Sequence, residues 1–171
     1  MTYIFDATPE NAMKGFFLDI ADSIEADKSG DLSGARTQFE EALSFLIDLE
    51  INRIQSKIDD TTLQEFIKDS CPELLKVERY LGAHGDIVIY RAEAAREDPD
   101  WYKLCIQRSV IQLLIQYYSN TPCGKYLEYY DLDTLDNEMR RVGEDQGPVP
   151  EKYVPKLPSS HWWWTYPTLI S

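Results

Sequence analysis

Three consecutive tryptophans near the C-terminus, Trp162, Trp163 and Trp164, are the residues whose type and spacing point most directly to a role. Each indole offers a large apolar area and one N–H donor, and tryptophan is enriched among the residues that dominate binding at interfaces. Three exposed indoles in a row would favour aggregation, so we expect the chain's own helices or a partner to cover them. Alternate side chains of an extended segment face opposite sides, which predicts Trp162 and Trp164 inward and Trp163 outward, with Tyr166 in the same apolar segment.

Arg108 is a charged residue within the most apolar helical stretch of the sequence. A buried arginine needs a carboxylate partner, because an unpaired buried charge is costly. Acidic residues on the long helix predicted upstream could supply it, and the candidates are Glu40, Glu41 and Glu50. We interpret Arg108 as part of a structural ion pair or as a rim residue whose guanidinium reaches the solvent, and an anion-binding site is the alternative.

Polar residues share the helix of Arg108, namely Ser109, Gln112 and Gln116. We favour helix–helix hydrogen bonds or an exposed strip for them over a pocket wall.

His84 lies in the stretch Gly-Ala-His-Gly-Asp, where Asp86 could orient it as a general base. Two positions apart in a loop is poor geometry for such a pair, and no G-x-S-x-G nucleophile motif is present, so a turn histidine is the better interpretation. His161 is expected to pack with the tryptophans.

The sequence contains none of the common motifs for metal or nucleotide binding: no H-E-x-x-H, no CxxC, no EF-hand loop, no P-loop and no G-x-G-x-x-G. We therefore expect neither a metal nor another cofactor. A site assembled from residues distant in the sequence remains open.

The chain is strongly acidic, with 30 Asp and Glu against 17 Lys and Arg and a formal charge of −13. That balance argues against direct nucleic-acid binding and against docking on anionic membranes. Between residues 128 and 138 there are five acidic and no basic residues, among them Asp131, Asp133 and Asp136. Such a surface can serve solubility alone, or it can steer the association of a basic partner.

The sequence predicts a cytoplasmic protein. The N-terminus has no basic stretch followed by an apolar run, as a secretory signal would have, and no apolar run is long enough to span a membrane. The three cysteines are an odd, widely spaced set, which favours a reducing compartment.

Helix signals dominate the elements that must position these residues. Thr8–Pro9 is a typical helix start. Apolar residues then recur at three- and four-residue spacing. Helices are predicted at 9–26, 32–58, 86–97, 100–119 and 131–142. Two further short helices are expected on either side of the Cys71–Pro72 bond, followed by a break at 82–86. Five of the nine prolines fall after Gly143, so residues 143–171 are expected to form an irregular tail.

These observations predict an all-α, single-domain bundle of six or seven helices, with residues 1–142 forming the bundle and residues 143–171 packed on it as a tail. The functional hypothesis is a non-enzymatic interaction module (an inhibitor, immunity-type or adaptor protein) that binds a basic partner through Trp162, Trp163, Trp164, Tyr166, Asp131, Asp133 and Asp136. One alternative is a small helical enzyme or ligand-binding protein with a pocket near Arg108, Gln112 and His84. Another is a structural subunit of a larger assembly, and the oligomeric state stays open.

Overall fold

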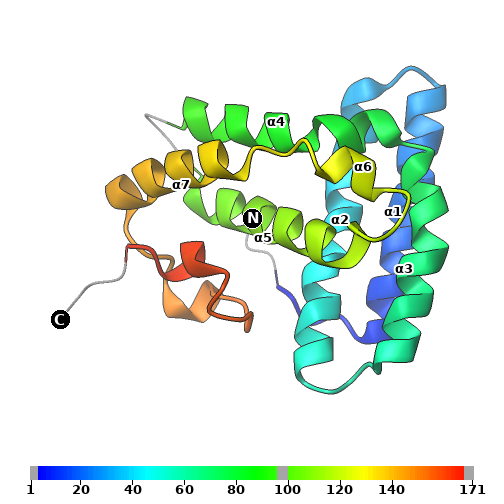
Figure 1. The fold of residues 1–171 in the computed structure, drawn as a ribbon, viewed down its shortest axis with the longest axis horizontal. Helices are drawn as coiled ribbons and strands as arrows, with labels where there is room; N and C mark the ends of the chain where they lie inside the picture. Colours follow the sequence, from blue (N-terminus) through cyan, green and yellow to red (C-terminus); the bar gives the residue numbers. More distant parts are fainter. Residues whose placement is uncertain (1–3, 96–99, 168–171) are drawn as a thin grey trace.

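The computed structural model describes residues 4–95 and 100–167, and within them the chain is all-helical (Figure 1). The predicted fold class is confirmed. The described residues form seven α-helices and two 3₁₀ helices: α1 (Pro9–Lys28), α2 (Leu32–Ile54), α3 (Asp60–Leu75), α4 (Glu78–Ala94), α5 (Trp101–Tyr118), α6 (Gly124–Leu127), α7 (Leu132–Gln146), η1 (Glu151–Tyr153) and η2 (Trp162–Thr165).

Helices α1, α2 and α3 stand side by side at one end of the molecule, and α4, α5 and α7 extend away from them (Figure 1). The α1 helix begins as predicted, with the Thr8 side chain accepting a hydrogen bond from the Asn11 backbone N–H. A buried hydroxyl ties the first two helices together, because Ser23 Oγ donates to the Ala35 carbonyl at 2.7 Å. The α2 helix ends at Ile54, four residues before the predicted end at Ile58.

The predicted break at Pro72 is wrong, because α3 runs through this residue to Leu75. Proline removes one backbone donor from a helix interior. Tertiary packing outweighs that loss here, since Cys71 and Leu74 on either side are both buried. The chain instead leaves the helix at Lys76 and starts α4 two residues later.

The predicted break at 82–86 is also wrong, because these residues lie inside α4. Gly85 does not form a turn but allows the Tyr130 ring to pack closely against α4. A Cβ atom at this position would lie 2.8 Å from Cδ1 of Tyr130, which is too close for a normal contact. The Tyr130 hydroxyl donates to the Leu81 carbonyl on the same helix. Ile87, Val88 and Ile89 are β-branched, yet they lie in α4, as predicted for the helix at 86–97.

The α5 helix is the buried centre of the second group, as its apolar sequence predicts, and it packs against α2, α4, α7 and η2. Asp100 caps it by accepting from the Lys103 backbone N–H at 3.1 Å. Asp98–Pro99, which repeats the helix-start pattern of Thr8–Pro9 and predicts a cap for this helix, lies outside the described residues. The α7 helix continues four residues beyond the predicted end at Val142, and Gly147, with a φ of 75°, ends it. The tail then passes beneath α5 and α7 to η2 (Figure 1).

Candidate functional site

The Ser109 hydroxyl on α5 anchors the C-terminal tail. The indole N–H groups of Trp163 and Trp164 donate to Ser109 Oγ at 3.0 and 2.8 Å, and His161 Nδ1 lies 2.9 Å from the same oxygen. A hydroxyl has two acceptor lone pairs and one proton. Both lone pairs are used by indoles, so the proton goes to His161 Nδ1 and the ring proton of His161 sits on Nε2.

This arrangement requires a neutral His161. Burial lowers the pKa of His161 to about 4, against a smaller opposing effect of Glu50. The ring also packs on Trp163, with 5.0 Å between centroids. The expectation that His161 packs with the tryptophans is confirmed. The helix–helix role suggested for Ser109 is wrong, since its partners lie in the tail.

The predicted alternation of the tryptophans is wrong as well. Residues 162–165 form a 3₁₀ helix and not an extended strand, so successive side chains are turned by about 120°. Trp163 and Trp164 are both buried, and Trp162 is the half-buried one. Trp162 lies between Tyr166, at 5.3 Å between ring centroids, and the Arg140 guanidinium, at 4.8 Å from its ring centroid. Among residues 161–167, Trp162 and Tyr166 therefore offer the accessible aromatic surface.

Arg108 forms a structural ion pair, but with a different carboxylate from those predicted. Its Nε and Nη2 contact the two oxygens of Asp136 on α7, at 2.7 and 3.3 Å, and its guanidinium lies 4.4 Å from the Trp163 ring centroid. Gln112 accepts a further bond from Nη1 at 3.3 Å. Asp136, predicted as a partner-binding residue, is thus already paired within the molecule.

Two of the three carboxylates proposed for Arg108 have other partners. Glu50 pairs with Arg53 and accepts from the Tyr117 hydroxyl at 2.6 Å and from Gln116 Nε2 at 3.0 Å. Glu40 pairs with Arg91 at 2.6 Å. The Gln116 bond joins α5 to α2, which is one of the helix–helix hydrogen bonds that the sequence suggested.

Acidic and aromatic side chains are exposed together where α6 leads into α7. We call the surface formed by Glu128, Tyr129, Asp131 and Asp133 the α6–α7 corner. Tyr129 is 84% exposed, and Glu128 and Asp133 take part in none of the ion pairs among the described residues. Asp131 caps α7, and its hydrogen bonds from Thr134 lower the pKa of its carboxyl group. The corner is a negatively charged surface with one free aromatic ring.

His84 is buried in α4 and does not occupy a turn, which corrects the sequence interpretation. It lines a cavity of about 210 Å³ together with Gln107 and the Glu40–Arg91 ion pair. Both His84 ring nitrogens and Gln107 Oε1 lack hydrogen-bond partners among the described residues. Burial, and then the charges of Arg91 and Arg36, lower the pKa of His84 to about 3, so the ring is neutral at pH 7.

The predicted pocket of Arg108, Gln112 and His84 does not form around this cavity, because only His84 is among its lining residues. Asp86 is exposed and makes no hydrogen bond with His84. The histidine and aspartate therefore do not form a general-base pair.

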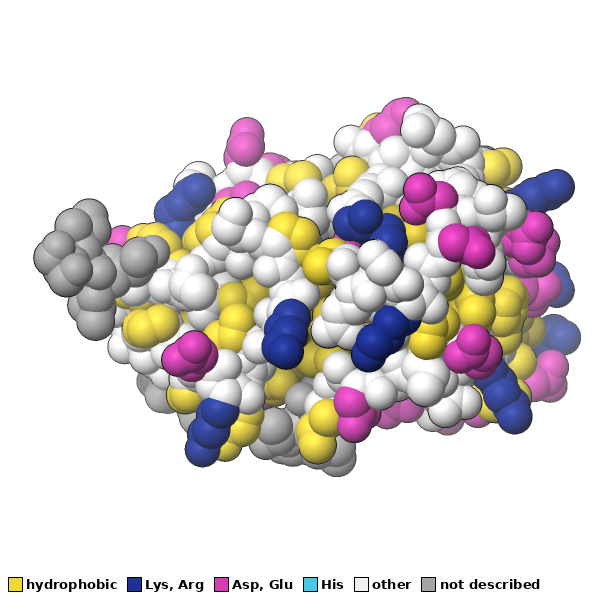
Figure 2. Space-filling model, turned by 90° about the horizontal axis from the view of Figure 1, so that it is seen from below, with side chains coloured by type: hydrophobic (Ala, Val, Ile, Leu, Met, Phe, Trp, Pro, Cys, Tyr) yellow, Lys and Arg dark blue, Asp and Glu magenta, His cyan; other side chains and the backbone are white. Residues whose placement is uncertain are grey.

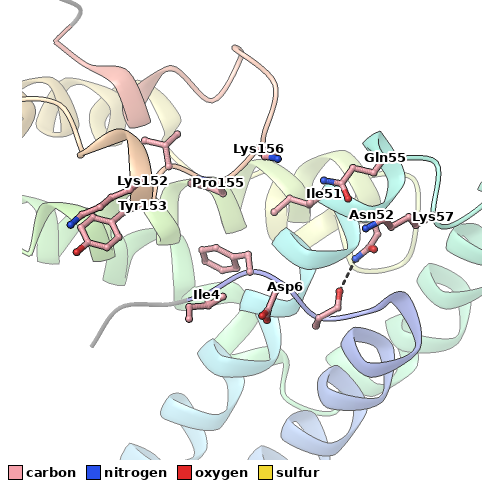
Figure 3. A pocket seen from close by; sticks show the side chains of 13 residues that line it. Ile4, Asp6, Ile51, Asn52, Gln55, Lys57, Lys152, Tyr153, Pro155 and Lys156 are labelled. Carbon is pink, nitrogen blue, oxygen red and sulfur yellow. Dashed lines mark hydrogen bonds between the residues drawn. The ribbon is translucent and has the colours of Figure 1, made fainter.

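A larger pocket of about 580 Å³ lies between the segment before α1, the end of α2 and the η1 region (Figure 3). Asn52 Nδ2 donates to the Ala7 carbonyl at 2.9 Å, and Asp48 accepts from the Ala7 N–H at 3.1 Å, which fixes the first segment against α2. Apolar lining comes from Phe5, Ile51, Val154 and Pro155, and basic lining from Lys57, Lys152 and Lys156.

The three lysines of this pocket take part in none of the ion pairs among residues 4–95 and 100–167. Lys and Arg side chains also stand beside exposed apolar surface near the middle of the face in Figure 2. One carboxylate, that of Asp6, lines the same pocket. Sequence reasoning missed this site because its residues come from three segments far apart in the chain.

No three His, Cys, Asp or Glu side chains of the described residues are grouped so that they could hold a metal ion. None of the helices in that part of the chain has both the length and the apolar character of a membrane span. Comparison with protein-family models, with curated proteins and with solved structures finds no match for this chain.

Proposed function

We propose that the protein is a non-enzymatic, cytoplasmic interaction module, of the inhibitor, immunity or adaptor type, that binds a basic partner protein through the α6–α7 corner. One observation carries the proposal: a tyrosine exposed over 84% of its surface is flanked by carboxylates that have no ion-pair partner among the described residues. Tyrosine is a common anchor at interfaces, and its ring attracts lysine and arginine.

The rest of the molecule supports this role through its charge. A formal charge of −13 raises the rate at which a positively charged partner meets the surface, and the effect falls as salt is added. Trp163 and Trp164 hold the tail in place and are not available to a partner. Trp162 and Tyr166, at the other end of α7, provide a second contact area of the same aromatic type.

The test is copurification from the producing cell with the tagged chain at about 0.05 M and about 0.5 M salt. We expect a basic protein that is recovered at low salt and lost at high salt. The triple variant Glu128→Gln, Tyr129→Ala, Asp133→Asn should lose it even at low salt. The matched control Glu65→Gln, Asp69→Asn removes the same charge from exposed positions on α3 and should retain the partner.

Two outcomes would contradict the proposal: a partner whose recovery is indifferent to salt, or equal loss in the α3 control. Oligomers of the chain alone, measured by sedimentation, would favour the structural-subunit alternative. Turnover of a small molecule that depends on His84 would favour the enzyme alternative.

A second candidate function is the binding of an anionic ligand with an apolar body in the pocket of Lys57, Lys152 and Lys156. The specific observation is that three lysines without ion-pair partners border apolar lining in a strongly acidic chain. Titration calorimetry with octanoate as the probe tests it. Lys57→Gln, Lys156→Gln should abolish the binding, and Lys14→Gln, Lys68→Gln, exposed on α1 and α3, should leave it unchanged.

A further inference from the structure

Two cysteines that lie 52 residues apart in the sequence meet inside the molecule. Cys71 Sγ on α3 and Cys123 Sγ at the start of α6 are 2.9 Å apart, and both residues are buried. This separation is about 0.9 Å longer than an S–S bond of about 2.05 Å. The two sulfurs therefore need to approach each other by only about 0.9 Å to reach bonding distance.

We propose that Cys71 and Cys123 are a disulfide-forming pair that a hydroperoxide oxidises to a covalent link between α3 and α6. One sulfur attacks the peroxide, the O–O bond breaks, and a sulfenic acid and one water form. The second sulfur attacks the sulfenic sulfur and displaces its oxygen, which leaves as a second water with the remaining thiol proton. Two thiols thus lose two electrons and two hydrogens, and hydrogen peroxide becomes two waters.

The third cysteine has different surroundings. Cys105 is buried in α5, and its thiol donates to the Trp163 carbonyl at 3.7 Å. Its sulfur has no hydrogen bond to another sulfur among those described. Cys105 is therefore a control within the same chain, because it is equally protected from solvent but has no partner for a disulfide.

Burial also sets the pace of the reaction. Burial, and then the hydrogen bond with Cys71, raise the pKa of the Cys123 thiol to about 12. The thiolate is the reactive form, so oxidation should be slow at pH 7 and faster at pH 9. Local unfolding that exposes the two cysteines to the peroxide should accelerate the oxidation further.

The experiment treats the reduced full-length chain with hydrogen peroxide at pH 9 and follows it by intact mass and by thiol titration in denaturant. We expect a mass loss of about 2 Da and a fall from three titratable thiols to one. Peptide mapping should join the peptides of Cys71 and Cys123. The midpoint of thermal unfolding should rise by about 5–15 °C, since the link closes a long loop.

Cys71→Ser and Cys123→Ser should each abolish the mass loss, and Cys105→Ser should preserve it. Three outcomes would overturn the proposal: a gain of oxygen without loss of hydrogen, a crosslink that contains Cys105, or three thiols remaining after prolonged treatment. Because the mass and thiol measurements use the unmodified sequence, the proposal stays testable even if a serine variant fails to fold.

Discussion

The Ser109 hydroxyl is the polar centre of the contact between the tail and α5. It accepts from two buried indoles and donates to a buried histidine. Each of these groups would lack a partner in the interior without it, and an unsatisfied buried donor costs more than a typical hydrogen bond contributes. The tail is therefore fixed by one side chain of α5 as well as by apolar packing.

Ser109→Ala should lower the free energy of unfolding by about 2–4 kcal/mol. The substitution removes the hydroxyl group and leaves three buried nitrogens, those of the two indoles and of His161, without a hydrogen-bond partner. Denaturant unfolding followed by tryptophan fluorescence measures it. Ser33→Ala, on the exposed first turn of α2, is the matched control and should change stability by less than about 0.5 kcal/mol. Equal effects of the two substitutions would show that the hydrogen bonds of Ser109 contribute little.

Asp19 shows a second effect at the residue scale. Burial, and then the charges of Glu41 and Asp22, raise the pKa of its carboxyl group from 3.8 to about 6. The folded state therefore binds a proton at a pH where the unfolded state does not. Ionised Asp19 opposes folding fully above pH 6, and this opposition disappears as the pH falls from about 6 to about 4.

Asp19→Asn should therefore stabilise the protein at pH 7.5, by up to about 1 kcal/mol after allowance for solvent screening. This stabilisation should shrink as the pH falls from about 6 to about 4. Thermal unfolding of both proteins at several pH values measures it. The charge-matched variant Glu65→Gln on α3 should show no such pH-dependent gain.

At the scale of elements, the sequence predicts most helices and the Thr8 cap of α1 but misplaces the breaks. Pro72 and Gly85 carry strong local signals against helix, yet both are inside helices because buried neighbours outweigh those signals. The Asp136–Arg108 pair, the Cys71–Cys123 contact and the Trp163 orientation depend on which helices become neighbours. Local periodicity does not encode that choice, so these features could not be predicted.

The α7 helix allows a direct comparison of two aspartates from the candidate site. Asp136→Asn leaves the buried Arg108 guanidinium without a full counter-charge, and we expect a loss of about 2–4 kcal/mol in unfolding free energy. Asp133→Asn, one turn earlier and exposed, should change stability by less than about 0.5 kcal/mol. Denaturant titrations of both variants distinguish them, and a similar cost for both would contradict the structural role of Asp136.

At the scale of the whole molecule, the dominant property is the large negative net charge. Its acidic excess could be predicted from composition, whereas the pocket of Lys57, Lys152 and Lys156 could not, because three separate segments build it. Net charge far from zero destabilises a compact state through self-repulsion. Salt screens that repulsion, so the charge has a consequence for stability as well as for binding.

We expect the midpoint of thermal unfolding at pH 7 to rise by a few degrees between about 0.02 M and about 0.3 M sodium chloride, over the range in which the Debye length becomes short. Circular dichroism at the helical band measures it. A midpoint that falls with added salt would mean that favourable ion pairs outweigh repulsion in this chain.

The pocket between the first segment, the end of α2 and the η1 region has a final consequence, for ligand discovery. The three segments that line it, residues 4–7, 51–57 and 152–156, come together only in the folded chain. A molecule bound there would therefore stabilise the folded state. A compound present at a hundred times its dissociation constant would add about 2.7 kcal/mol to stability. Melting curves recorded across a library of small acids would therefore reveal occupants of this pocket without any knowledge of the biological role.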